Sequence, residues 1–166
     1  IYQRGIFQQD SLGITNPERL VMGMVDLYTS RGGVYKQFAV DRVVLADDSI
    51  RLEGQGERLR ADKVVVAAGA WSRTLARQLG DDIPLETERG YHLMLPESSG
   101  ALLSRAVVNE ESSFVLTPME SGLRMVAQIE FGGLDIAPNY SRIRALLPHA
   151  KRMLPKLEIE EKSVWM

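Results

Sequence analysis

The sequence predicts a mixed α+β fold, in which helices flank a large antiparallel or mixed β-sheet. Segments with apolar residues at helical spacing alternate with short strand-like segments. After residue 83, several strand segments follow one another with turn signals between them. Hydrophobic residues make up 45% of the 166 residues and charged residues 25%, as in an ordinary globular protein with a core.

Composition excludes several classes of partner. The formal net charge is −2, and no basic stripe predicts binding to nucleic acid. No apolar run approaches the roughly 20 residues of a transmembrane segment. The absence of cysteine excludes thiolate chemistry, and two histidines alone argue against a metal site. These features fit a cytoplasmic protein.

Both ends of the sequence are unusual. The chain starts at Ile1 without an initiator Met and without a signal peptide, and it stops after the apolar stretch 163–166. Natural termini are more often polar and frayed. We therefore expect a piece excised from a longer protein.

The first half of the chain predicts a helix, a β-meander, a buried strand and a second helix. Asn16 is suited to cap the first helix, which we expect over residues 17–31. Three consecutive valines indicate a strand covered on both faces. The expected strands are 34–40, 42–46, 49–53, 57–61 and the buried strand 63–68, with a turn at Asp47-Asp48 and the second helix at 72–79.

The second half predicts an antiparallel sheet and a long helical segment. Glu120-Ser121-Gly122 is typical of a hairpin turn. Asn139 or Ser141 should cap a helix that Pro155 closes, and Pro148 should kink or divide it. The expected strands are Leu85–Leu95, Ala106–Val108, Ser113–Pro118, Leu123–Glu130 and 158–166. The change of character at residues 81–84 predicts domains at 1–82 and 83–166.

The segment Val64–Trp71 is the first candidate site. Small residues follow the valines, which lets the chain turn tightly and lets a ligand approach the backbone. In open α/β sheets, ligands collect where a strand ends and a helix begins. The alternative interpretation is a core strand with a tight exit.

Arg89-Gly90-Tyr91-His92 is the second candidate. Arg89 could bind a carboxylate, Tyr91 offers a hydroxyl, and His92 could change charge near neutral pH. On a strand, Arg89 and Tyr91 share one face and His92 points to the other, so one pocket takes all three only if the strand bulges. The alternative is three ordinary side chains on a half-exposed sheet. Arg89 and Tyr91 are favoured over His92.

Taken together, the motifs of this chain resemble the FAD-dependent oxidoreductases of the D-amino-acid oxidase/dehydrogenase superfamily, and most of all the bacterial D-amino-acid dehydrogenase-like proteins. The resemblance covers nearly the whole chain. The motifs that carry it are Val64–Ser72, Ile83-Pro84-Leu85, Arg89–His92, Leu116-Thr-Pro-Met119 and Glu130-Phe-Gly-Gly133.

The resemblance implies a substrate lobe plus part of a flavin lobe, with domain 1–82 as the partial flavin lobe and 83–166 as the substrate lobe. It implies that Val40, Ala68, Gly69, Ala70 and Trp71 lie along the FAD. It further implies hydride transfer from an amino-acid or amine substrate to the flavin, with Arg89, Tyr91 and His92 as the candidate substrate residues. No catalytic residue is predicted.

The chain departs from the family pattern in two places. It contains no Gly-x-Gly-x-x-Gly loop for the pyrophosphate and no closing Gly-x-Arg-Pro segment. We therefore expect the isolated chain to be inactive, without bound FAD, and prone to self-association. The alternatives are a sarcosine, glycine or secondary-amine oxidase of the same superfamily and a self-contained binding domain. The sequence does not identify the electron acceptor, which could be oxygen or a quinone. It also does not decide whether the parent protein attaches peripherally to a membrane.

Overall fold

The computed structural model describes residues 4–46 and 48–166. Contacts within the chain separate these residues into two compact units, which we describe one at a time. Residues 4–24 and 88–166 form the sheet unit, and Val25–Thr87 forms the meander unit. The predicted lobes 1–82 and 83–166 are defined by what they bind as well as by packing. Contacts within the chain do not test this division, so it stays a prediction.

Among the described residues, the sheet unit contains a five-stranded antiparallel sheet in the order β5-β6-β7-β4-β8. The strands are β4 (Arg89–Leu95), β5 (Val107–Asn109), β6 (Phe114–Met119), β7 (Gly122–Glu130) and β8 (Ser163–Trp165). The predicted antiparallel strands of the second half are confirmed, but the first begins at Arg89 and not at Leu85. The last strand is shorter than predicted, because only its final residues pair with β4.

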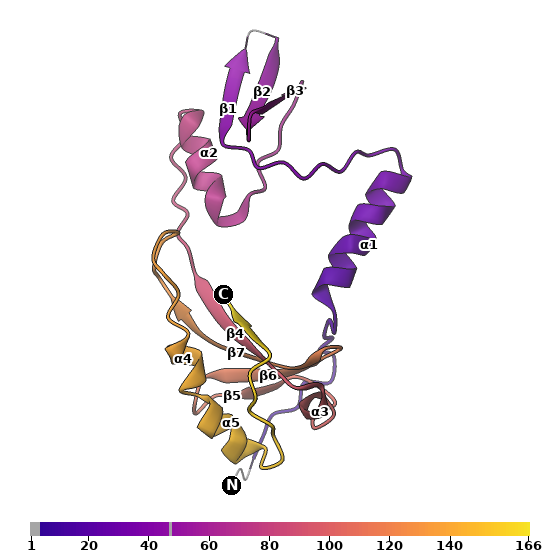
Figure 1. Ribbon diagram of the computed structural model, residues 1–166, viewed down its shortest axis with the longest axis vertical. Helices are drawn as coiled ribbons and strands as arrows, with labels where there is room; N and C mark the ends of the chain where they lie inside the picture. Colours follow the sequence, from indigo (N-terminus) through magenta and orange to yellow (C-terminus); the bar gives the residue numbers. More distant parts are fainter. Residues whose placement is uncertain (1–3, 47) are drawn as a thin grey trace. The chain divides into compact units, whose positions relative to one another are not determined.

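Helices cover one face of this sheet. Figure 1 shows α4 (Ser141–Arg144) and α5 (Leu147–Met153) along it, and a short helix, α3 (Glu97–Gly100), follows β4. Pro148 divides the predicted helix, and it sits in the first turn of α5, where its missing N–H removes no helical bond. The buried cluster between the layers includes Tyr91, Leu93, Leu95, Phe114, Leu116, Leu123, Met125, Ile143, Ala150 and Leu157.

The helix α1 (Pro17–Ser30) begins as predicted, because the side-chain oxygen of Asn16 accepts a hydrogen bond from the N–H of Arg19 at 2.9 Å. The Asn16 amide donates to Glu120 at 2.9 Å, and Arg19 forms an ion pair with the same carboxylate. These bonds hold the start of α1 to the β6–β7 turn. No residue of α1 is buried, so its apolar stripe faces solvent.

The meander unit contains the strands β1 (Arg42–Ala46), β2 (Ser49–Gly54) and β3 (Glu57–Ala61), which pair in that order as an antiparallel meander. The helical turn η1 (Gly69–Trp71) and the helix α2 (Ser72–Gln78) follow. The predicted meander and helix are confirmed. Of the predicted Asp47-Asp48 turn, Asp47 lies outside the described residues.

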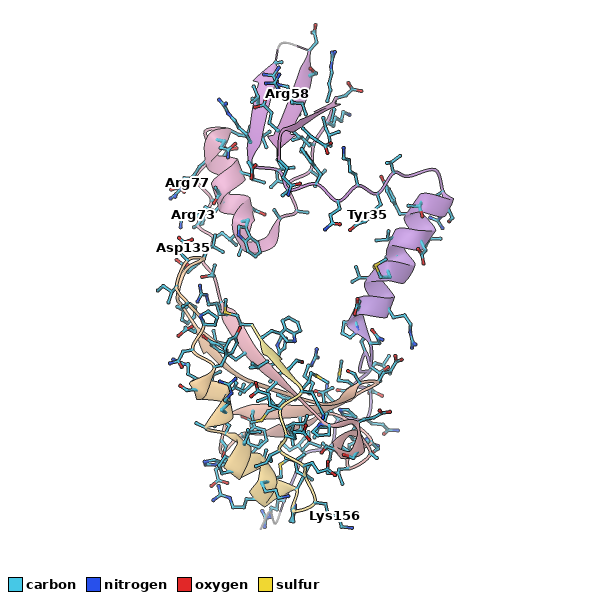
Figure 2. The ribbon with its side chains drawn as sticks, in the orientation of Figure 1. Tyr35, Arg58, Arg73, Arg77, Asp135 and Lys156 are labelled. Atoms are coloured by element: carbon cyan, nitrogen blue, oxygen red, sulfur yellow. The ribbon has the colours of Figure 1, made fainter. Side chains whose placement is uncertain are left out.

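Two predicted strands of the meander unit are wrong. Residues 34–40 and 63–68 form no regular secondary structure and pair with no strand in the described part of the chain. Val34 is 82% exposed and Val65 is 89% exposed, so 63–68 is not a buried strand. A strand needs neighbours that take up its N–H and C=O groups. Figure 2 shows Tyr35 on the first of these segments.

No helix in the described ranges is both long and apolar enough to cross a membrane.

Candidate functional site

The turn at Ala68–Trp71 is the first candidate site, and it belongs to the meander unit. The N–H of Ala68 donates to the Ser72 hydroxyl at 3.0 Å, and the N–H of Trp71 donates to the Ala68 carbonyl at 3.1 Å. Gly69 has a φ of +52°, a conformation that favours glycine, and a Cβ there would meet no atom within 4 Å. The backbone at Gly69 is therefore open to a ligand, and Trp71 beside it is 63% exposed.

Gln78 at the end of α2 connects this turn to the segment that carries Val40. Its side-chain oxygen accepts from the N–H of Val43, and its amide donates to the carbonyl of Asp41, both at 2.9 Å. The half-buried Val40 directly precedes this anchored residue. The unit therefore fixes both predicted flavin-contacting segments through one helix.

A second set of contacts restrains the C-terminal end of α2. Figure 2 shows Arg73 and Arg77, one helical turn apart, and both form ion pairs with Asp82, at 3.4 and 3.0 Å. The hydrogen bond from Arg77, and to a lesser degree that from Arg73, keeps the pKa of the Asp82 carboxyl below its ordinary value. These bonds fix the direction in which the chain leaves α2.

On β4, the structure divides the three predicted substrate residues between the two faces of the sheet. Arg89 and Tyr91 are buried on the face that the helices cover. His92 lies on the other face. We call this other face the open face, because no helix of the sheet unit covers it in the described ranges; it carries His92, Met94, Thr117, Arg124, Val126 and Trp165.

A bulge interrupts the pairing of β4 with β7. Gly90 pairs with Ile129 and Tyr91 with Ala127, which leaves Gln128 as the extra residue of β7. Gln128 has a φ of +59°, which is uncommon for a residue with a side chain. The bulge is on the partner strand, so it does not bring Arg89, Tyr91 and His92 to one face.

Tyr91 is the buried centre of a partly exposed polar cluster. Its hydroxyl donates to Glu130 at 2.5 Å and accepts from the backbone N–H of Asn139 at 2.9 Å. Arg89 lies 3.9 Å and Arg142 3.7 Å from the same carboxylate. The cluster therefore links two strands to the loop that precedes α4, and it occupies both hydrogen-bonding functions of the Tyr91 hydroxyl.

Arg89 holds the same loop at a second point. One guanidinium nitrogen donates to the carbonyl of Ile136, and Gly132 packs so close that a Cβ there would lie 3.5 Å from the guanidinium. The other terminal nitrogen, Nη2, is buried without a partner among the described residues. Arg89 therefore keeps one guanidinium nitrogen, with its N–H donors, for an additional acceptor.

His92 has a different environment. Its ring packs edge-on against Trp165, and its Nε2 atom is buried without a hydrogen-bond partner in the described ranges. Burial, and then the positive charge of Arg124, lower the pKa of the His92 imidazole below its ordinary value. The ring is therefore kept neutral at pH 7.

Sequence reasoning did not identify three residues of this region. Arg124 comes beside His92 through the register of two strands that are distant in the sequence, and Trp165 does so through β8. The positive φ of Gln128 has no signal in its residue type. Glu130 is quoted above as part of a motif, and the structure shows it as the partner of Tyr91.

Comparison with known proteins gives matches of three kinds. The family described as FAD dependent oxidoreductase (DAO) matches residues 1–166. A D-amino-acid oxidase of Bradyrhizobium diazoefficiens is 39% identical over 99 residues, which cover 60% of this chain and 23% of that protein. A D-amino acid dehydrogenase of Dechloromonas aromatica is 32% identical over 115 residues, covering 68% of this chain and 28% of that protein.

Two solved structures share the fold. Glycine oxidase from Geobacillus kaustophilus gives a TM-score of 0.71 at 21% identity, over 88% of this chain and 40% of that one. Iminodiacetate oxidase from Chelativorans sp. BNC1 gives a TM-score of 0.67 at 20% identity, and the match covers 87% of this chain and 40% of that one. These matches confirm the predicted mixed α/β fold class. The chain spans about a quarter of the length of the two curated relatives. Because the family match covers the whole sequence, the chain belongs to the FAD dependent oxidoreductase family.

Proposed function

We propose that this chain forms part of an enzyme that oxidises amino acids, with D-amino acids as the first candidates. Family membership supports the use of FAD. The names of the two relatives, a D-amino-acid oxidase and a D-amino acid dehydrogenase, support the substrate class. A bound flavin would supply the redox chemistry by accepting a hydride from the substrate carbon, while the protein positions the reactants.

The observation that carries the cofactor assignment is the turn at Gly69. Its left-handed backbone and the open space before it fit the close approach of a flat ring, and the neighbours Ala68 and Ala70 are small. In the proposal, Ala68–Trp71 contacts the FAD, and Val40 contributes its backbone. The chain has no glycine-rich loop for the pyrophosphate, so we expect the isolated chain to bind FAD weakly and to be inactive.

Titration of the purified chain with FAD, followed by flavin fluorescence, tests this assignment. Gly69→Ala should weaken the residual binding. Gly80→Ala is the matched control, because Gly80 also has a positive φ, of 92°, and also has no atom within 4 Å of a Cβ. Equal affinity in the two variants would remove Gly69 from the flavin site. Tight stoichiometric binding by the unchanged chain would contradict the expected weak affinity.

Arg89, Tyr91 and His92 stay proposed substrate residues. The sequence favours Arg89 and Tyr91, whereas the contacts in the structure favour His92. His92 has an unpartnered ring nitrogen and lies on the open face. Arg89 has one unpartnered nitrogen on the covered face. The Tyr91 hydroxyl is fully engaged. The arrangement therefore favours His92 as the first residue to test.

The alternative substrates are glycine, sarcosine and other secondary amines. A panel of D-amino acids and N-methyl amines, assayed for oxidation by the complete enzyme that the proposal implies, separates these classes. Preference for N-methyl amines would overturn the D-amino-acid assignment. Comparison of oxygen with a quinone in the same assay would identify the electron acceptor. The self-contained binding domain has less support, because the family match covers residues 1–166.

We also propose that the isolated chain self-associates. Leu20, Met24 and Tyr28 on α1 are 43%, 59% and 56% exposed, and contiguous apolar surface of this kind drives association. Monomeric elution from a sizing column at high concentration would contradict it. A cytoplasmic location, with peripheral membrane attachment of the parent protein, stays a prediction.

A further inference from the structure

Arg124 has no carboxylate partner within the described ranges, unlike three other arginines around the sheet. Arg89, Arg142 and Arg144 each have a glutamate within 4 Å, at 3.9, 3.7 and 2.7 Å. Arg124 is half-buried, forms no ion pair within the described ranges, and its Nε is buried without a hydrogen-bond partner. Withdrawing an arginine from water without an acceptor is costly, so the position calls for an anion.

His92, on the same face of the sheet, also has a buried nitrogen, Nε2, without a hydrogen-bond partner in the described ranges. Strand pairing sets His92 opposite Val126 and Met94 opposite Arg124, so His92 and Arg124 are diagonal neighbours. Residues in that relation lie about 7–8 Å apart, and their Cβ atoms are somewhat closer, which lets one small ligand reach both. After burial, the positive charge of Arg124 also contributes to the lowered pKa of the His92 imidazole, which agrees with this placement.

None of the strand residues paired with this pair or with Met94 in the described ranges is acidic. The residues paired with His92, Met94 and Arg124 are Val126, Trp165, Ser163 and Thr117. Apolar neighbours strengthen a charge–charge contact, because they lower the local dielectric. A cationic guanidinium and a neutral imidazole, each with a buried nitrogen that has no partner within the described ranges, are therefore neighbours, and none of these paired residues supplies a carboxylate.

We infer that Arg124 and His92 form a carboxylate-binding site on the open face of the sheet. The guanidinium supplies charge and paired N–H donors that suit a planar carboxylate. The neutral imidazole donates one further hydrogen bond through Nε2–H in the tautomer that carries its proton there. The site deepens the proposed function and rests on it for the identity of the ligand, an amino-acid carboxylate.

The chain offers a direct probe, because it has two histidines, His92 and His149. His149, on α5, contacts Ser112 and Arg152 and serves as an internal reference. In the intact chain labelled at histidine, titration with acetate or with D-alanine at constant ionic strength should shift the His92 nitrogen resonances saturably. Sodium chloride over the same range should not, and the His149 resonances should stay in place.

Arg124→Met keeps the aliphatic stem and removes the charge, so it should weaken the His92 response at least tenfold. Arg152→Met removes the same charge at the other histidine and should leave the His92 response intact. Arg124→Gln, with an amide spectrum to confirm folding, replaces the methionine variant if that variant does not fold. No saturable shift, an undiminished shift in the Arg124 variants, or equal weakening in Arg152→Met would each overturn the site.

The two ligands separate this inference from the proposed function. A response to acetate and D-alanine supports both. A response to acetate alone supports the carboxylate site and counts against an amino acid as its ligand. Because the titration contains no flavin, failure of FAD binding at Gly69 would leave the result at His92 standing.

Discussion

Replacing Tyr91 with phenylalanine removes one hydroxyl on which two other groups of the sheet unit depend. The side chain is fully buried, and the ring would keep its place against Tyr140, 5.9 Å away between centroids. The hydroxyl donates to Glu130 at 2.5 Å and accepts from the N–H of Asn139 at 2.9 Å. The change therefore leaves a carboxylate without its shortest hydrogen bond, in a place that water reaches poorly.

The size of the effect follows from the kind of bond that is lost. A hydrogen bond to a charged group contributes about 1.5–3 kcal/mol. Asn139 is exposed, so water can replace the second bond at little cost. We expect Tyr91→Phe to lower the free energy of unfolding of the sheet unit by about 2–3 kcal/mol and the urea midpoint by about 1 M.

The assay needs a signal from the sheet unit alone. The chain has two tryptophans, and Trp71→Phe leaves Trp165, on β8 beside β4, as the fluorescent reporter. Tyr140→Phe is the matched control, because the Tyr140 hydroxyl makes no hydrogen bond within the described ranges, and we expect less than about 0.5 kcal/mol for it. Equal midpoints for Tyr91→Phe and Tyr140→Phe would refute the assigned role of the hydroxyl.

Three further predictions concern backbone and charge. Gly122→Ala should destabilise the sheet unit by about 2 kcal/mol or more in urea unfolding, because Gly122 has a φ of +133° and a Cβ would lie 2.3 Å from the Leu95 carbonyl oxygen; an unchanged midpoint would contradict this. Gly23→Ala, inside α1 with free space around a Cβ, should raise the stability of that helix by about 1 kcal/mol, seen as slower amide exchange there. The lowered pKa of His92 means that the unfolded chain binds more protons, so stability falls as pH drops below the unfolded value of about 6.5. In a buffer without carboxylates, His92→Gln should lose less stability between pH 7 and pH 5 than the unchanged chain, and an equal loss would exclude His92 as the source.

Local signals in the sequence predicted the elements that depend on local structure. Asn16 caps α1, Pro148 divides α4 from α5, and Gly122 closes the β6–β7 turn, each through its own backbone or side-chain chemistry. The alternation along β4 separated Arg89 and Tyr91 from His92 for the same reason. These features need no knowledge of distant residues.

The remaining features depend on contacts that a local pattern does not contain. The valines of 63–68 are typical of a buried strand, but no described strand pairs with this segment, and Val65 is exposed. The neighbourhood of Arg124 and His92 follows from the pairing of β7 with β4, which are separated by two other strands in the sequence. The partner of Tyr91 could be found only once Glu130 was placed at the end of β7.

The position of β8 has a consequence for folding kinetics. β4 ends at Leu95 and pairs on one side with β8, which begins only at Ser163. Contacts between residues so distant in sequence require a large loop to close first, which raises the contact order and slows folding. During synthesis on the ribosome, β5, β6 and β7 can pair as they emerge, whereas one edge of β4 stays unprotected until residues 163–165 have been made.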